Sequence, residues 1–207
     1  MENRKIHIHA GGPLNARVYR VEGADGSRWI EKDFSACSRL VRNTVGRFLV
    51  WRECWILHRL EKTGVVPRNV RKLSTFALRE DFVEGETLQE ARGRGPGGVP
   101  REFFEALEAG VRACHAARFV HLDLHNYRNV MVAPGWRPVL VDWQSALPTF
   151  WMPGPLRRAL ERIDAAGVLK FWNKCRPGEL DDERLRQLER SRFLRRHFWL
   201  PRLHRRR

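Results

Sequence analysis

The sequence predicts a compact α+β protein with two lobes, a β-rich part followed by a more helical part. Three observations lead to this fold class. Residues 16–34 alternate between apolar and polar side chains around a turn at 23–26, which is typical of a β-hairpin. Residues 101–119 repeat apolar side chains at helical spacing. Short β-rich runs at 130–132 and 138–141 flank the turn APGWR and predict a second hairpin.

The composition supports one substantial domain or two small lobes that share a cleft. The chain has 207 residues, of which 43% are apolar, and this is enough for a hydrophobic core. Its four cysteines are widely separated and form no CxxC pair, so we expect a reducing, cytoplasmic compartment. The N-terminus lacks a signal-peptide core, and no uncharged apolar run reaches the roughly 18 residues of a membrane span.

The net charge of +15 is distributed unevenly. From Arg184 to the end of the chain there are ten arginines against one acid, Glu189. Such a segment favours partners that carry phosphate groups, which include nucleotides, anionic membrane surfaces and nucleic acids. The sequence contains no zinc-finger, helix-turn-helix or RNP-type aromatic motif, so nucleic acid is not an expected partner.

Residues 1–83 are expected to form the β-rich lobe, with one long helix. The first hairpin ends near Lys32. The second half of residues 38–64 predicts a helix that stops at Gly64. The inward stripe of this helix consists of Leu49, Glu53, Ile56, Leu57 and Leu60.

The segment FVEGETL (82–88) is expected to connect the two lobes. Short apolar runs near 70–73 and 76–78 lead into it, Gly85 marks a turn, and Thr87 can begin a helix.

Residues 84–150 are expected to form the polar centre of the second lobe. Residues 91–100 are rich in Gly and Pro and predict a loop, after which the helix at 101–119 leads to the stretch HLDLHNYRN at 121–129. The remainder, 151–207, predicts a basic helical tail with helices at 155–174 and 179–199.

Two interpretations of residues 121–129 do not involve phosphate. The side chains of His121, Asp123 and His125 alternate and would share one face of a strand, with His7 and His9 as a second pair, as in a hydrolase metal cage. The stretch looks like a loop, however, and the chain lacks the repeated βα units of barrels that carry such cages. Alternatively, its Asp and Asn side chains only cap backbone groups of a polar turn.

The third interpretation is phosphoryl transfer. This chemistry uses a lysine on the nucleotide phosphates, a glutamate that orients the lysine, an aspartate beside the attacking hydroxyl, and an asparagine and a second aspartate on Mg²⁺. The chain offers a candidate for each part in that order, namely Lys32, Glu53, Asp123, Asn129 and Asp142.

With this order of residues, the chain resembles the protein-kinase-like superfamily, and most closely its small bacterial members, the RIO-like kinases and the lipopolysaccharide core sugar kinases. The sequence HLDLHNYRN with VLVDWQ is the specific part of the resemblance, which runs from about residue 14 to residue 147. It implies a protein-kinase-like fold with a reduced C-terminal helical lobe. It also implies Asp123 as catalytic residue, and FVEGETL as the hinge between the lobes.

The same resemblance implies ATP and Mg²⁺ as cofactors. Its candidate residues for nucleotide binding are Lys32, Glu53 and Glu84, and its candidate metal ligands are Asn129 and Asp142. His121 is expected to orient the loop, His125 and Arg128 to contact substrate or phosphate, and Gln144 to replace the glycine of the usual Asp-Phe-Gly triplet.

Two departures from the family pattern leave alternatives open. Asp123 and Asn129 are six residues apart, whereas the common kinase loop has five, so Asn126 is a second candidate for the metal ligand. GGP at 11–13 precedes the expected first strand, but no GxGxxG motif follows it.

The acceptor expected from the sequence is an alcohol group of a lipopolysaccharide-type sugar or of another small or glycolipid molecule. Only 65 residues follow Asp142, which leaves no room for a long activation segment and a full peptide-docking lobe. The alternatives are a RIO-like protein serine/threonine kinase and a non-catalytic nucleotide-binding module. The basic tail, with Trp151, Trp172 and Trp199, is a candidate for peripheral contact with an anionic membrane, such as the cytoplasmic face of the inner membrane.

Overall fold

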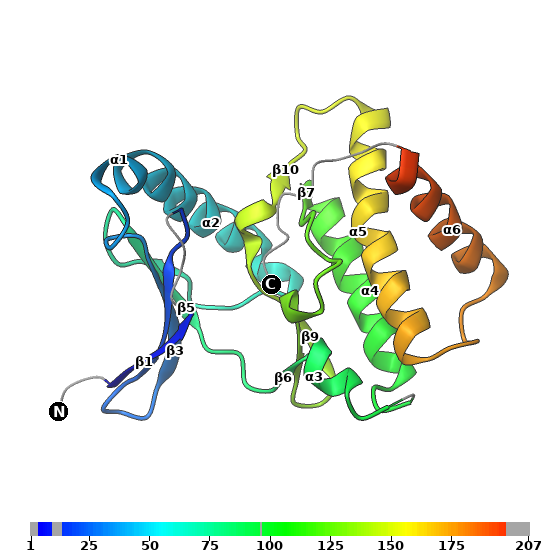
Figure 1. Ribbon diagram of the computed structural model, residues 1–207, viewed down its shortest axis with the longest axis horizontal. Helices are drawn as coiled ribbons and strands as arrows, with labels where there is room; N and C mark the ends of the chain where they lie inside the picture. Colours follow the sequence, from blue (N-terminus) through cyan, green and yellow to red (C-terminus); the bar gives the residue numbers. More distant parts are fainter. Residues whose placement is uncertain (1–3, 10–13, 96, 198–207) are drawn as a thin grey trace.

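The structure is a computed structural model that describes residues 4–9, 14–95 and 97–197, and for His9 and residues 192–197 it describes the backbone alone. Figure 1 shows a β-sheet with one long helical segment on one side of the molecule and a group of longer helices on the other side. The chain therefore has the mixed α+β organisation that the sequence predicts.

The first sheet is antiparallel and has the strand order β1-β2-β3-β5-β4. Its strands are β1 (Arg4–His9), β2 (Arg17–Glu22), β3 (Arg28–Asp33), β4 (Arg71–Lys72) and β5 (Ala77–Asp81). The predicted hairpin is the pair β2–β3, in which Val18 lies opposite Lys32.

The position of the first strand differs from the sequence expectation. β1 precedes the GGP segment, which therefore connects β1 to β2 instead of preceding the first strand. Polar and basic side chains dominate β1, which obscures its alternation in the sequence. The conformation of residues 10–13 lies outside the described residues.

A helical segment crosses one face of this sheet and turns toward the second lobe (Figure 1). It consists of α1 (Arg39–Val41), a π-helical stretch (Arg42–Gly46), α2 (Arg47–Leu60) and a 3-10 turn (Glu61–Thr63). The predicted inward stripe is confirmed for four of its five residues, because Glu53, Ile56, Leu57 and Leu60 are buried, whereas Leu49 is half-buried.

Residues 82–85 join β5 to β6 (Glu86–Thr87), which pairs with β8 (Val130–Ala133). The φ angle of Gly85 is +126°, and a Cβ atom at this position would lie 2.1 Å from the carbonyl oxygen of Val132. Only glycine allows the connection to pass so close to β8. Thr87 then caps α3 (Leu88–Arg92) through a capping box with Glu90, so the predicted helix start is confirmed.

The second predicted hairpin is the antiparallel pair of β8 and β9 (Arg137–Leu140), in which Val130 lies opposite Leu140. Two short strands, β7 (Phe119–Val120) and β10 (Leu147–Pro148), form a third sheet. 3-10 turns at Tyr127–Asn129 and Trp143–Ser145 follow β7 and β9 along the chain.

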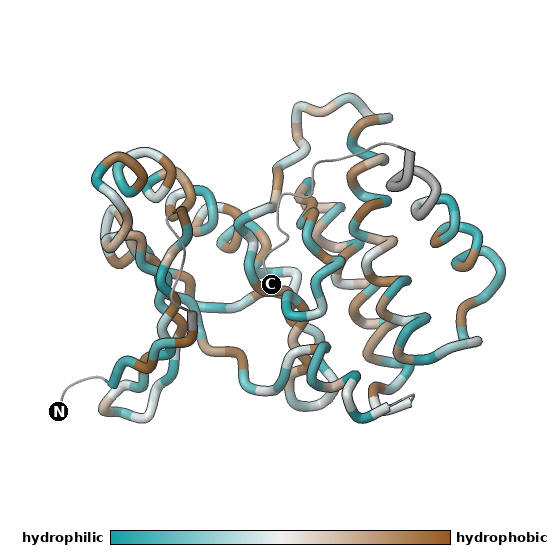
Figure 2. Tube along the Cα trace, viewed as in Figure 1, coloured by the Kyte–Doolittle hydropathy of each residue, from teal (hydrophilic) through white to brown (hydrophobic). Residues whose placement is uncertain are grey.

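The long helices of the second lobe are α4 (Arg101–Ala116), α5 (Gly154–Cys175) and α6 (Asp182–His197). The predicted tail thus includes a helix that packs into the core, because α5 contacts α4 and buries residues along its second half. Figure 2 shows that α6, in contrast, is mostly hydrophilic.

The tryptophans of this region have different environments. Trp172 is buried on α5 and stacks on Phe104 with ring centroids 5.7 Å apart, so it serves the core and does not face a membrane. Trp151 is exposed, and Trp199 lies outside the described residues. Among the described residues, no helix has the length and apolar character that crossing a membrane requires.

Candidate active site

Lys32 on β3 is buried between two carboxylates. Its Nζ atom lies 2.5 Å from Oε1 of Glu53 on α2 and 3.2 Å from Oε1 of Glu80 on β5. Glu80 lies opposite Ile30 in the strand register, so it projects from the same face of the sheet as Lys32. The packing of α2 on this face brings Glu53 to the same ammonium group.

The charges of this cluster shift two pKa values upward. Burial alone would lower the pKa of Lys32, but the carboxylates of Glu53, Glu80 and Asp142 outweigh it and raise this pKa, so the ammonium stays charged. Burial, together with Glu80 and Asp142, raises the pKa of Glu53 to about 7, against the opposing effect of Lys32. Two carboxylates thus pair with one ammonium, and the charge of Asp142 adds to the negative charge around it.

The loop at residues 121–129 is fixed from behind by Asp164, a buried residue of α5. The carboxylate of Asp164 accepts hydrogen bonds from the backbone N–H groups of His121 and Leu122, each over 2.7 Å, and contacts Nε2 of His115 at 3.1 Å. The close approach depends on Gly167, where a Cβ atom would lie 2.6 Å from the carbonyl oxygen of Leu124.

His121 is itself buried, and its ring joins the loop to the end of the β8–β9 hairpin. Nε2 lies 3.1 Å from the carbonyl oxygen of Val141, and the ring packs on Trp143 with centroids 4.7 Å apart. The side chains of His121, Asp123 and His125 therefore belong to a loop and not to one face of a strand. Within the described part of the chain, no group of three or more His, Cys, Asp or Glu side chains gathers as a metal cage.

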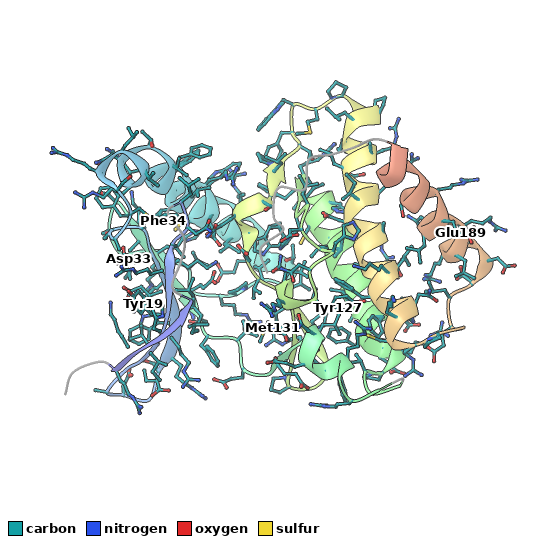
Figure 3. The ribbon with its side chains drawn as sticks, in the orientation of Figure 1. Tyr19, Asp33, Phe34, Tyr127, Met131 and Glu189 are labelled. Atoms are coloured by element: carbon teal, nitrogen blue, oxygen red, sulfur yellow. The ribbon has the colours of Figure 1, made fainter. Side chains whose placement is uncertain are left out.

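Asp123 and Asn129 are in direct contact. Nδ2 of Asn129 donates hydrogen bonds to Oδ2 of Asp123 at 2.8 Å and to its carbonyl oxygen at 3.1 Å. Asn126 instead caps the 3-10 turn by accepting from the N–H of Arg128, and its Nδ2 donates to Oδ1 of Asn129 at 3.1 Å. Figure 3 labels Tyr127 and Met131, which precede and follow Asn129 by two residues in the sequence.

The second hairpin brings Asp142 next to Asn129. The N–H of Val141 donates to the carbonyl oxygen of Asn129 over 3.0 Å, which continues the β8–β9 ladder by one step. Asp142 follows with a φ angle of +62°, a conformation that Asp tolerates better than most residues. Its side chain is exposed, and its charge acts on both Lys32 and Glu53.

Five of the six candidate residues thus gather between the lobes, whereas Glu84 stands apart. Glu84 is exposed and forms an ion pair with Arg28 of β3 at 2.7 Å. Its hydrogen bonds and ion pairs within the described residues do not reach the other five. Arg128 is exposed beside the loop and donates to Oε1 of Gln89 at 3.1 Å.

Gln144 contacts α2 through its backbone, because its carbonyl oxygen accepts a hydrogen bond from the guanidinium of Arg52. Arg52 precedes Glu53 on α2, so this contact ties α2 directly to the segment that follows Asp142. It therefore links the two lobes at the position where their charged residues meet.

Two residues of this arrangement were not among the sequence candidates, although each carries a signal in the sequence. Glu80 is two residues from the buried Leu78, so period-two alternation places it on the inner face of β5. Asp164 is four residues before the buried Val168 and eight before Trp172, on the apolar stripe of α5.

The residues present fit Mg²⁺ and a nucleoside triphosphate. Mg²⁺ is usually held by one or two protein oxygen ligands, with substrate phosphates and water completing its shell. Asp142 and Asn129 offer a carboxylate and an amide oxygen from adjacent backbone positions. The charged ammonium of Lys32 is a suitable partner for phosphate oxygens, and Glu53 holds it in place.

Comparison with known families agrees with this geometry. The sequence model of the RIO domain family matches residues 19–184. This range includes the Lys32 cluster, the loop at 121–129, Asp142 and Asp164. A search of curated proteins found no match. Since the matched range covers well over half of the chain, the protein belongs to the RIO domain family, an atypical branch of the protein-kinase-like proteins.

Proposed function

We propose that this protein transfers the γ-phosphoryl group of ATP to an alcohol, in a reaction that depends on Mg²⁺. The observation that carries the proposal is the buried Lys32–Glu53 ion pair, together with the hydrogen bond from Arg52 to the carbonyl oxygen of Gln144 that holds the segment of Asp142 against the same helix. A phosphate-binding lysine on one lobe and a metal-binding carboxylate on the other are the parts that phosphoryl transfer needs on either side of a nucleotide.

In this proposal, Lys32 binds nucleotide phosphate oxygens and Glu53 orients its ammonium. Asn129 and Asp142 hold Mg²⁺, which neutralises the negative charge of the phosphates when bound. Positioning and charge neutralisation would supply most of the rate enhancement.

Asp123 accepts the proton of the attacking hydroxyl. Its Oδ2 atom accepts a hydrogen bond from Nδ2 of Asn129, whereas Oδ1 accepts no hydrogen bond within the described residues. Oδ1 is therefore the atom that receives the hydroxyl proton, and Asn129 keeps the carboxylate in orientation. Glu84 lies on the connection between the lobes, where its backbone rather than its carboxylate would contact the nucleotide, because Arg28 binds the carboxylate.

For the acceptor, we propose a small molecule or a glycolipid, such as a lipopolysaccharide-type sugar. The chain passes from Asp142 to the start of α5 through residues 143–153, which contain one 3-10 turn and one two-residue strand. This short connection supports an acceptor that needs little docking surface. A protein serine or threonine is the second candidate, and the match to the RIO domain favours it.

The test is phosphoryl transfer by the wild-type protein and by Asp123→Asn, with labelled ATP and with core sugars, lipid extracts and generic protein substrates as acceptors. Asp123→Asn should lower turnover by about 10²- to 10⁴-fold, the usual contribution of a general base. Its affinity for ATP should stay within about threefold of wild type, because Asp123 contacts the acceptor.

Asp25→Asn is the matched control, since Asp25 is an exposed turn residue whose hydrogen bonds to Ser27 an asparagine can also accept. It should transfer phosphate at the wild-type rate. Wild-type turnover by Asp123→Asn would remove the catalytic assignment, and the absence of ATP binding in the wild type would remove the proposed function.

A further inference from the structure

Six apolar side chains that are each at least 47% exposed lie on two segments that are far apart in the sequence. Leu40, Phe48 and Trp51 belong to the α1–α2 segment, whereas Phe150, Trp151 and Leu156 belong to the connection before α5 and to its first turn. Their exposed fractions range from 47% to 75%. We call these six residues the aromatic surface.

The aromatic rings of this surface form a chain of contacts that joins the two segments. Ring centroids lie 6.1 Å apart between Phe48 and Trp51, between Trp51 and the half-buried Trp55, and between Trp55 and Phe150. Phe150 and Trp151 follow at 6.3 Å. In Figure 1, the α1–α2 segment and the connection between β10 and α5 both lie along the upper edge of the molecule.

This edge of the protein is also strongly basic. Residues 39–60 and 148–160 contain seven arginines, and their one acid is Glu53, which is buried and faces the candidate active site. Arg52 lies over the ring of Phe48 and Arg59 over the ring of Trp55, at 5.3 and 5.6 Å from the centroids. Arg157 has a partner in Glu161 at 3.7 Å.

Neither the core nor the candidate active site explains the aromatic surface. The opposite face of α2 supplies the core contacts, with Ile56, Leu57 and Leu60 fully buried. Large exposed apolar patches with a polar rim mark interaction surfaces. The combination of Trp and Phe with arginines is typical of proteins that rest at the headgroup level of an anionic bilayer.

Two other partners fit less well. A single-stranded nucleic acid would use the aromatic rings for stacking, but it gives no role to the exposed aliphatic side chains Leu40 and Leu156. A second copy of the chain would bring arginine-rich edges together with no exposed acid on either of these segments, and like charges at an interface are unfavourable.

We propose that the aromatic surface docks the protein on a bilayer that contains anionic phospholipid. Trp51 and Trp151 insert at the headgroup level, and the arginines contact lipid phosphates. The docking edge includes α2, whose inner face carries Glu53, so the bilayer lies on the opposite side of this helix from the nucleotide site. The proposal does not depend on phosphoryl transfer, because binding to the bilayer needs neither ATP nor an acceptor.

The experiment is co-sedimentation of the full chain with phosphatidylcholine vesicles that contain either no phosphatidylglycerol or about one third of it, without nucleotide. The wild type should bind the anionic vesicles at least tenfold more tightly than the neutral ones. Trp51→Ala/Trp151→Ala should weaken binding to the anionic vesicles by tenfold or more, because it removes two anchoring rings. Arg39→Gln/Arg47→Gln should also weaken binding to the anionic vesicles, and the loss should be smaller at high salt than at low salt, since salt screens the charges that this double substitution removes.

Trp136→Ala is the matched control. Trp136 is 42% exposed in the turn between β8 and β9, outside both segments of the aromatic surface, and its replacement should leave vesicle binding unchanged. The same urea midpoint for all variants would establish that they are folded. Equal binding of wild type and Trp51→Ala/Trp151→Ala would overturn the proposal, because other basic segments would then carry the binding. A concentration-dependent dimer that the double substitution abolishes, without vesicle binding by the wild type, would overturn it in favour of a second copy.

Discussion

The carboxylate of Asp164 accepts a hydrogen bond from the backbone N–H of His121 over 2.7 Å, which joins α5 to the loop that contains Asp123. The next residue, Leu122, has a φ angle of +65° and donates to the other oxygen of Asp164. Non-glycine residues adopt such φ angles at a cost in free energy, and they keep them only where the surroundings hold them. α5 thus stabilises a strained turn one residue before Asp123.

Asp164→Asn should lower the free energy of unfolding by about 2–4 kcal/mol, because a buried carboxylate with three hydrogen-bond partners is replaced by an amide with one acceptor oxygen. Urea denaturation measures the effect. Asp182→Asn, at an exposed site in the first turn of α6, should change stability by less than about 0.5 kcal/mol. Similar stabilities of the two variants would contradict the anchoring role of Asp164.

Replacement of Asn129 and of Asn126 separates the two candidate metal ligands. Asn129→Ala should raise the Mg²⁺ concentration for half-maximal ATP turnover by about 10-fold or more, because it removes a ligand and the contact that orients Asp123. Asn126→Ala loses a turn cap and one hydrogen bond to Asn129, and we expect less than a threefold change. Mg²⁺ titrations of turnover give both values. The reverse order would assign the metal to Asn126.

Glu80 is expected to set the pH dependence of nucleotide binding. Glu53 holds Lys32 as a carboxylate, and because its pKa is about 7, ATP affinity should fall as the pH drops through this value. The charge of Glu80 contributes to the raised pKa of Glu53. Glu80→Gln should therefore lower the pKa of Glu53 and shift the acidic limb of the binding curve to lower pH.

The measurement is ATP affinity between about pH 5.5 and pH 9. Glu31→Gln serves as control, because Glu31 is also buried on β3 but projects from the opposite face of the sheet, where it pairs with Lys5 at 2.6 Å. Its acidic limb should coincide with that of the wild type. If the acidic limb of the ATP-affinity curve of Glu80→Gln coincided with that of the wild type, Glu80 would have no effect on the pKa of Glu53.

Gly85→Ala should destabilise the protein by at least about 2 kcal/mol more than Gly26→Ala. Both glycines have positive φ angles, but a Cβ atom at Gly85 would overlap the backbone of Val132, whereas one at Gly26 meets nothing within 4 Å. Both substitutions introduce backbone strain, so the difference between their losses of unfolding free energy measures the cost of the overlap with Val132 alone. Equal losses would show that the connection can move away from β8.

Much of the local structure is predictable from the sequence because short-range periodicity and turn residues determine it. The β2–β3 and β8–β9 hairpins, the helix that ends near Gly64, and the start of α3 at Thr87 all follow from alternation, helical spacing or capping. β1 was not predicted, because the alternation of Ile6 and Ile8 is short and lies among Arg, Lys and His side chains. The packing of α5 was not predicted either, because its three arginines and two lysines made the whole helix look like a solvated basic segment.

The sequence by itself determined the family resemblance and the order of the polar residues Lys32, Glu53, Asp123, Asn129 and Asp142, since spacing along the chain and neighbouring strands carry this information. Only the tertiary structure decided which groups meet. It added Glu80 to the lysine cluster and Asp164 behind the loop, placed Asn129 rather than Asn126 against Asp123, and turned Glu84 toward Arg28. The physical reason is that each of these contacts joins segments distant in the chain or depends on side-chain orientation within a loop, so local patterns do not specify it.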